Sequence, residues 1–304
     1  MNEIRIPQNK YFNSDFKNCI GQFFGKSISQ NKFYETNFYY LFNFPRISES
    51  EGKIDIKINE DIANFNWNKE FIKEILNRKN QSFSKLDVYG FQVESFTFLC
   101  SWRLVVGLGA SHPQETSMTL HHVYGIPYVP GSAVKGVTRH WAVLKFTDEN
   151  QDFIITQIKE KESLSNPDFY DAIQKVSKAL DNGNELNIKV NDITFKDLIE
   201  IFGTQKQRGK VIFFDAYPIE NINLKIDIMN PHYPKYYGGE APPTDWQNPV
   251  PIKFLTVENT KFKFYLTGKE EKLLNIAKTL LIDALKNYGV GAKTSLGYGL
   301  FKEI

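Results

Sequence analysis

The chain has 304 residues, a formal net charge of +2 and 41% hydrophobic residues, as in a soluble globular protein of one elaborated domain or two. The small charge excludes a general nucleic-acid coat, but a local basic track stays open, because backbone affinity depends on where the cations sit. Cys19 and Cys100 are too few for a disulfide framework or a cysteine-based zinc site, and neither a signal peptide nor an apolar run of ~20 residues is visible. We therefore expect a cytoplasmic protein without a membrane partner.

Residues 1–90 are predicted to form an N-terminal, mainly helical extension. Aromatic and apolar residues recur at roughly helical spacing in Phe16–Phe24, Phe33–Phe42 and Lys69–Leu76, and a polar break with a glycine covers Ser48–Lys53. No catalytic pattern is visible here, so packing or docking is the expected role.

From Gln92 onward apolar residues occupy every second position, which predicts a strand. A second strand is predicted over Arg103–Leu108. After a loop over residues 109–122, Pro127 and Pro130 predict an extended approach to a helix. The apolar stripe of that helix is Val134, Val137, Trp141 and Leu144.

The start of this helix is a candidate phosphate site. Ser132 is predicted to cap it, and Lys135 and Arg139 lie one turn apart on another face. Free amides and two cations favour an anion. An ordinary amphipathic helix with solvated charges is the equally open alternative.

Residues 146–200 are predicted to form a helical insertion, followed by a basic loop over residues 201–210. Val211–Tyr217 and Asn223–Ile228 are predicted strands, and Asn230–Pro251, rich in proline and aromatic residues, is a long irregular loop. Loops of that length in compact domains are usually functional or ordered by a partner.

The last third of the chain is predicted to contain a hairpin, a helix and a short strand: Lys253–Val257, Lys261–Thr267, Glu270–Tyr288 with Gly289 as a left-handed cap, and Tyr298–Lys302. Without the insertion the order is strand, helix, strand, a hairpin or loop, strand, helix, strand. This order predicts an α+β, ferredoxin-like or RRM-like domain over residues 91–304, with an open sheet face as an RNA platform.

The sequence does not match the standard motifs for nucleotide binding or zinc binding. Gly289–Ser295 lacks the glycine before the lysine that a Walker loop needs, so it predicts a tight turn at which Lys293 can neutralise an anion. The five histidines lack the paired spacing of a helical zinc site, and Asp215, inside an apolar strand, is expected to pair locally. We expect neither a metal nor a cofactor.

Six segments together resemble the RAMP superfamily of CRISPR effector proteins and, within it, the sixth-subunit family of type III-B (Cmr) complexes. Each alone is weak, but six in the right order are specific, and they span about residues 100–304. They are Val106–Gly109; Thr119–Gly136; Ile201–Gln205 with Phe213–Ala216; Asp227–Tyr233; Asp245–Ile252; and Gly289–Thr294 with Gly297–Gly299.

The resemblance implies a non-catalytic RNA-binding backbone subunit for antiviral defence, which caps the backbone filament near the 3′ end of the CRISPR RNA. The implied partners are CRISPR RNA, target RNA, the repeated RAMP backbone subunit, the small helical subunit and a neighbouring RAMP subunit. The candidate RNA-binding residues are Ser132, Lys135, Arg139, Lys206, Arg208, Tyr233, Lys293, Gly297, Tyr298 and Gly299.

Catalysis is expected to be absent. In the family's target-cleaving subunit a catalytic aspartate lies between the first strand and the first helix, whereas Ala110–Pro130 here contains no aspartate. The alternative is a metal-independent endoribonuclease that processes CRISPR RNA with His112, His121, His122 and Tyr124. Adjacent histidines on an extended segment point to opposite sides, which argues against it.

Overall fold

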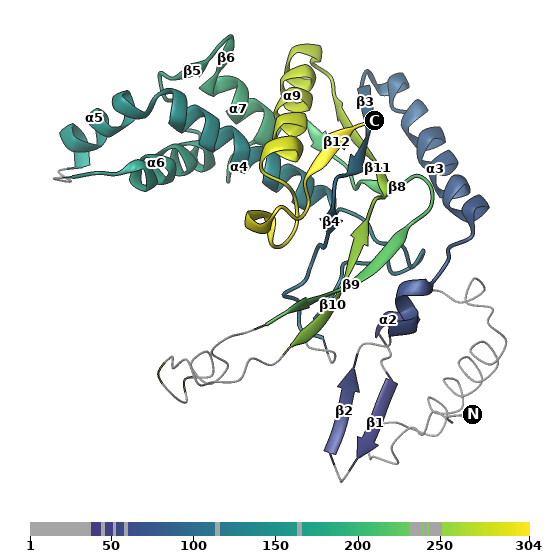
Figure 1. Cartoon of the computed structure of the whole chain (residues 1–304). Coiled ribbons are helices and arrows are strands. Elements are labelled where there is room, and N and C mark those ends of the chain that lie inside the picture. Colours follow the sequence, from purple (N-terminus) through teal and green to yellow (C-terminus); the bar gives the residue numbers. More distant parts are fainter. Residues whose placement is uncertain are drawn as a thin grey trace.

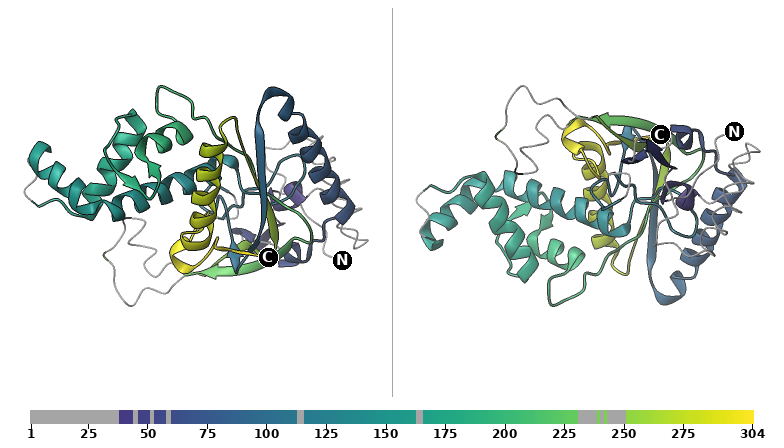
Figure 2. Two further views of the ribbon diagram at one scale, coloured as in Figure 1. Left: turned by 90° about the horizontal axis from the view of Figure 1, so that it is seen from above. Right: turned by 90° about the horizontal axis from the view of Figure 1, so that it is seen from below.

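The computed structural model describes residues 38–43, 46–50, 53–57, 60–112, 116–162, 166–230, 239, 242 and 251–304. A central antiparallel sheet has helices α4 and α9 on one face and α3 on the other (Figures 1 and 2). A group of further helices extends from α4 to one side of the sheet (Figure 1).

The central sheet has the strand order β12-β3-β11-β7, and β8 also pairs with β11. Helix α4 connects β3 to β7, and α9 connects β11 to β12. This order, with two crossover helices on one face, is ferredoxin-like and confirms the predicted α+β class. The elements are β3 (Gln92–Cys100), α4 (Gly131–Glu149), β7 (Ile212–Phe213), β8 (Tyr217–Pro218), β11 (Lys261–Gly268), α9 (Glu271–Asn287) and β12 (Phe301–Glu303).

The alternation of β11 builds the core. Phe262, Phe264 and Leu266 are fully buried on one face of the strand. Phe264 stacks on Phe96 of β3 with ring centroids 5.6 Å apart. The stripe of α9 that contains Leu273, Leu280 and Leu281 is equally buried, as the helical period predicts.

The opposite face of the sheet is covered by α3 (Lys69–Ser84), which corrects the prediction of an open RNA platform. Phe83 lies 4.5 Å from Tyr265 of β11 and 4.8 Å from Phe214, ring centroid to ring centroid. The Tyr265 hydroxyl donates a hydrogen bond of 3.2 Å to Asn80. Burial of this tyrosine raises its pKa to about 12.

A second sheet, β4 (Arg103–Leu104), β10 (Ile252–Glu258) and β9 (Asn223–Met229), has the order β4-β10-β9. The predicted strand Arg103–Leu108 therefore ends early. The reason is that the Val106 carbonyl accepts the amide of Thr119, after which Gly107 adopts a φ of +78°. Most of the loop between β9 and β10 lies outside the described residues.

Helices dominate the predicted insertion, although α4 itself continues to Glu149 before α5 begins. Capping boxes at Asp168 and Thr194 start α6 and α7. The elements are α5 (Gln151–Glu162), α6 (Phe169–Asn182), β5 (Lys189–Val190), β6 (Ile193–Thr194) and α7 (Phe195–Phe202).

Among the N-terminal residues that the structure describes, some form strands where helix was predicted. The expected break Ser48–Lys53 lies within a hairpin of β1 (Arg46–Ser50) and β2 (Lys53–Lys57). The helix predicted from Lys69 exists and runs to Ser84, with Asn68 as its N-cap, whereas Phe16–Phe24 lies outside the described residues. The remaining elements are α2 (Phe38–Asn43), η2 (Glu60–Asn64) and η3 (Asp87–Tyr89).

Candidate nucleic-acid interface

The N-terminus of α4 is closed by groups of the protein itself. The N-cap residue is Pro130, so Ser132 lies inside the first turn and the prediction that it caps the helix was wrong. The Gly131 amide donates to Oδ1 of Asp215 over 2.7 Å. A Cβ on Gly131 would stand 2.5 Å from the Phe213 carbonyl oxygen, so the strand segment and its aspartate occupy the predicted phosphate position.

Asp215 joins three elements, which confirms that it pairs locally. Its Oδ2 accepts a hydrogen bond of 3.1 Å from the Tyr217 hydroxyl, and Nζ of Lys79 on α3 lies 4.0 Å from the centroid of that ring. Burial lowers the pKa of Lys79, and the negative charge of Asp215 opposes this shift. Burial, with Asp215, raises the pKa of Tyr217.

Lys135 and Arg139 bind the helical insertion. Nζ of Lys135 donates to the Phe202 carbonyl over 2.7 Å, at the last residue of α7. Nη2 of Arg139 contacts Asp181 at 2.6 Å and the Ser177 carbonyl at 3.2 Å. Burial, and then the charges of Arg139 and Arg208, lower the pKa of Lys135. The three cations are thus neighbours, although two of them already hold α6 and α7 against α4.

The loop after α7 carries two further candidate RNA-binding residues, Lys206 and Arg208, at the protein surface. A bridge between Gly203 and Arg208 closes it, and Oγ1 of Thr204 accepts the amide of Lys206 over 3.1 Å. Lys206 and Arg208 are exposed, and neither forms an ion pair with any residue in the described ranges. They can therefore reach an anion without breaking an existing ion pair.

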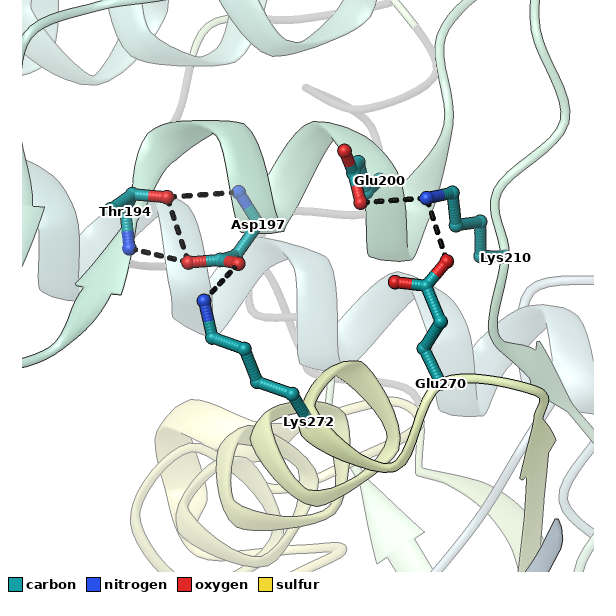
Figure 3. A network of polar contacts seen from close by, with 6 residues as sticks. All are labelled: Thr194, Asp197, Glu200, Lys210, Glu270 and Lys272. Carbon is teal, nitrogen blue, oxygen red and sulfur yellow. Dashed lines mark hydrogen bonds and ion pairs between the residues drawn. The ribbon is translucent and has the colours of Figure 1, made fainter.

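Two networks fix the base of this loop against α9 (Figure 3). Lys210 pairs with Glu200 and Glu270, each at 2.8 Å. One turn along, Lys272 pairs with Asp197 at 2.7 Å. Burial opposes the charge of Asp197, but hydrogen bonds from Lys272 and Thr194 outweigh it and lower the pKa of this carboxyl.

The second predicted group is the glycine loop Gly289–Gly299, which lies against β4. The Ala292 amide donates to the Val105 carbonyl at 2.8 Å, and the Gly299 amide to the Arg103 carbonyl at 2.7 Å. Gly299 has a φ of +69°, and a Cβ there would stand 1.9 Å from the Val290 carbonyl oxygen. Only glycine fits this approach, so the motif is explained first by packing.

Tyr298 anchors the loop. It is 5% exposed, and its hydroxyl donates to Asp227, which also pairs with Arg103. Burial opposes the charge of Asp227, but hydrogen bonds from Tyr298, the Ile228 amide and Arg103 lower its pKa. The Tyr298 ring therefore cannot receive a base.

Sequence reasoning missed two exposed groups around the loop, Trp102 and Leu296, whereas Lys293 was predicted. Trp102 packs 4.9 Å from Tyr298 and is 43% exposed, and Leu296 is 63% exposed. Nζ of Lys293 lies 5.3 Å from the Phe254 ring centroid. Trp102 stands beside the predicted strand residue Arg103, and an apolar ring at that strand start was the only available signal.

The basic loop after α7 and the glycine loop Gly289–Gly299 lie on either side of helix α4. Arg139 of α4 faces the insertion, and the next residue, His140, lies 4.8 Å from the Tyr288 ring, directly before the glycine loop. The structure thus places Lys135 and Lys293 against different elements, α7 and β10, with α4 between the two groups. Tyr233 lies outside the described residues.

His112 lies apart from the other candidate catalytic residues, whereas His121, His122 and Tyr124 come together. Nε2 of His112 lies 3.2 Å from Asn43 Oδ1, and its ring stacks on Phe42. His121 and His122 stack in parallel, 5.3 Å apart, so the expectation of opposite directions was wrong. A turn follows His121, whose Nδ1 accepts the amides of Val123 and Tyr124, each at 3.3 Å.

The described residues contain neither a metal-binding cluster nor a membrane-spanning helix. No group of three or more His, Cys, Asp or Glu side chains there is arranged to hold a metal ion. No helix in the same ranges combines the length and apolar character needed to cross a bilayer.

Known proteins resemble this chain over most of its length. A family model described as "RAMP superfamily" matches residues 95–302. Identity to the CRISPR system Cmr subunit Cmr6 of Pyrococcus furiosus is 38%, covering 84% of this chain and 86% of that protein. Identity to the CRISPR system CMR subunit Cmr6 of Saccharolobus solfataricus is 22%, covering 84% and 73%.

Two solved structures are also similar. The crystal structure of Cmr6 from Pyrococcus furiosus has 37% identity and a TM-score of 0.48, covering 71% of this chain and 98% of that one. The cryo-EM structure of the Type III-B Cmr-beta bound to cognate target RNA has a chain with 19% identity and a TM-score of 0.49, covering 95% and 88%. From the family match and the 38% identity, this chain belongs to the RAMP superfamily and, within it, to the Cmr6 family.

Proposed function

We propose that the chain is a non-catalytic, RNA-binding subunit of a type III-B CRISPR effector complex, capping its backbone near the 3′ end of the CRISPR RNA. The observation that carries the proposal is the 38% identity, over 84% of the chain, to a protein named as a Cmr subunit. Its partners would be CRISPR RNA, target RNA and the neighbouring RAMP and small helical subunits, in the cytoplasm.

The geometry favours a path for RNA on both sides of α4. Lys206 and Arg208 supply unpaired exposed cations beside the insertion. Lys293 and the exposed ring of Trp102 supply a cation and a stacking surface beside the glycine loop. Cations that hold phosphates and rings that stack on bases are the usual components of single-strand binding.

Ser132, Lys135 and Arg139 have a smaller part in this proposal. Lys135 and Arg139 are engaged with α7 and α6, and Asp215 takes the amide nearest to Ser132. Lys135 thereby holds the end of α7 from which the exposed loop starts, and Arg139 holds α6. Gly297, Tyr298 and Gly299 likewise shape the backbone that Lys293 projects from.

The histidine-based endoribonuclease is the competing function, and one observation favours it. Burial, with the charges of His122 and Lys79, lowers the pKa of His121, which favours the neutral imidazole that a general base needs. Because Nδ1 accepts two backbone amides, Nε2 carries the hydrogen of the neutral ring, so a general-base role would require this tautomer to change.

The test compares RNA affinity at several salt concentrations for Lys206→Ala/Arg208→Ala, Lys293→Ala and the matched control Lys159→Ala/Lys196→Ala, whose exposed lysines lie elsewhere on the insertion. The first pair should reduce the salt slope by about two, and Lys293→Ala by about one. Unchanged slopes in all variants would contradict the proposed path.

A second measurement decides between scaffold and enzyme. The wild-type chain is incubated with labelled repeat RNA in a chelator. The scaffold predicts intact RNA and co-purification with other Cmr subunits. Specific cleavage that is lost in His121→Ala would establish the endoribonuclease instead.

A further inference from the structure

A series of aromatic rings runs from the core to the surface between α3 and residues 121–128. Tyr217, 1% exposed, stacks on Tyr128 with centroids 5.6 Å apart and an interplanar angle of 12°. Tyr128 meets the edge of His121 at 5.6 Å. His121 then stacks on Tyr124 at 4.2 Å and on His122 at 5.3 Å, both nearly parallel.

The outer end of this series is open to solvent. The His122 side chain is exposed, and Phe71 of α3, 41% exposed, meets the edge of Tyr124 at 6.1 Å. Packing explains Tyr217, which is buried, and Tyr128, which is half-buried against the core. It does not explain a parallel stack that continues to an exposed imidazole, where little apolar surface is removed from water.

The segment that carries the rings is fixed in place. The Trp67 indole donates to the Gly125 carbonyl at 3.1 Å, and the Gly125 amide donates to the His121 carbonyl at 2.7 Å. Leu120 and Pro127 form a bridge across the same turn. The stack is therefore preorganised, and a flat ligand would add to it without a further ordering cost.

The chemistry of the stack favours a nucleobase over an apolar protein segment. Its members are imidazoles and phenols, which combine a π face with polar edges, and Lys79 adds a cation close enough to influence His121. Stacking on aromatic rings is the sequence-tolerant way in which proteins hold single-stranded RNA.

We propose that His122, backed by His121 and Tyr124, forms a subsite that stacks one unpaired base of a bound RNA. The subsite rests on the proposed function, that the chain binds RNA, but lies apart from the cations and the glycine loop that define it. It supplies stacking, whereas Lys206, Arg208 and Lys293 supply charge.

The test uses the full chain and short single-stranded RNAs that carry one 2-aminopurine at successive positions, because stacking quenches its fluorescence. Wild type should quench the probe at one position. His122→Ala should abolish that quenching and weaken binding roughly 5- to 10-fold, whereas His122→Phe, which keeps a ring, should retain both. Val123→Ala, at the exposed neighbour, is the matched control.

The outcomes separate the two hypotheses. RNA binding with unchanged quenching in His122→Ala overturns the subsite and leaves the proposed function standing. Wild type that binds no RNA overturns both. If His122→Ala binds RNA normally but no longer joins other Cmr subunits, the stack is a protein contact and the subsite is wrong. Because His122 is exposed, the melting temperature should not change in either variant.

Discussion

The amide of Gly131 donates a 2.7 Å hydrogen bond to the carboxylate of Asp215, so the first amide of α4 is already paired with an anion of the chain itself. The partial positive charge of the helix terminus thus stabilises the fold at the junction of α3, α4 and β8. Under the proposed function, RNA contacts then come from side chains that project beyond this junction.

Removal of this carboxylate should weaken the whole junction. Asp215→Ala leaves the Gly131 amide and the Tyr217 hydroxyl without their partner, and we expect a loss of about 2 kcal/mol in the free energy of unfolding. Urea denaturation measures it. Asp192→Ala, at an exposed turn between β5 and β6, is the control and should change stability by less than about 0.5 kcal/mol.

Local periodicity was enough to predict the strands β3, β9, β10 and β11 and the helices α3 and α9, since each carries its own apolar pattern. The prediction failed where a residue far away in the sequence determines the local structure. Leu104 is the last strand residue because the glycine loop and Thr119 take the next carbonyls. The β1–β2 hairpin was missed because polar residues dominate it, with only Ile47, Ile54 and Ile56 alternating.

The candidate site was predicted in part for the same reason. Sequence identified the residue types and their segments, but the partners of Tyr298 and Arg139 lie 71 and 42 residues away. Nothing in the local pattern of Gly297–Gly299 indicates that Asp227 buries the tyrosine between the glycines. The stack at His121 also depends on Tyr217, from another element.

The packing of α3 on the sheet gives a second prediction. Half-buried Phe83 packs between Phe214 and Tyr265, so Phe83→Ala should cost about 2 kcal/mol of unfolding free energy through lost burial. Thermal denaturation with a conserved far-UV spectrum measures it. Tyr89→Ala, 70% exposed just beyond the helix, is the control; an equal loss in both variants would mean that α3 does not pack as described.

The lowered pKa of Asp227 predicts that the free energy of unfolding depends on pH. Its pKa is lowered in the folded chain, so its contribution to stability is present above the unfolded value of about 4 and is lost as the pH falls through the folded pKa. Asp227→Asn should cost about 2 kcal/mol at neutral pH, and the difference from wild type should shrink in acid.

Urea denaturation of Asp227→Asn and wild type across the acid range checks this. Asp152→Asn, exposed at the start of α5, should follow wild type at every pH. A difference between Asp227→Asn and wild type that stays constant into acid would mean that the Arg103 and Tyr298 contacts do not depend on the charge of Asp227.

An Arg139 variant distinguishes a structural role of this side chain from a role in RNA binding. Its guanidinium spans Asp181 and the Ser177 carbonyl, so Arg139→Ala should loosen α6 from α4 and cost about 1 kcal/mol, because the pair is partly exposed. The salt slope of RNA binding should stay within experimental error of wild type, since this cation has a protein partner. Lys206→Ala should show the converse, an unchanged melting temperature with a smaller salt slope. If instead Arg139→Ala reduces the slope by about one with no loss of stability, its ion pair opens in the RNA complex and Arg139 contacts phosphate directly.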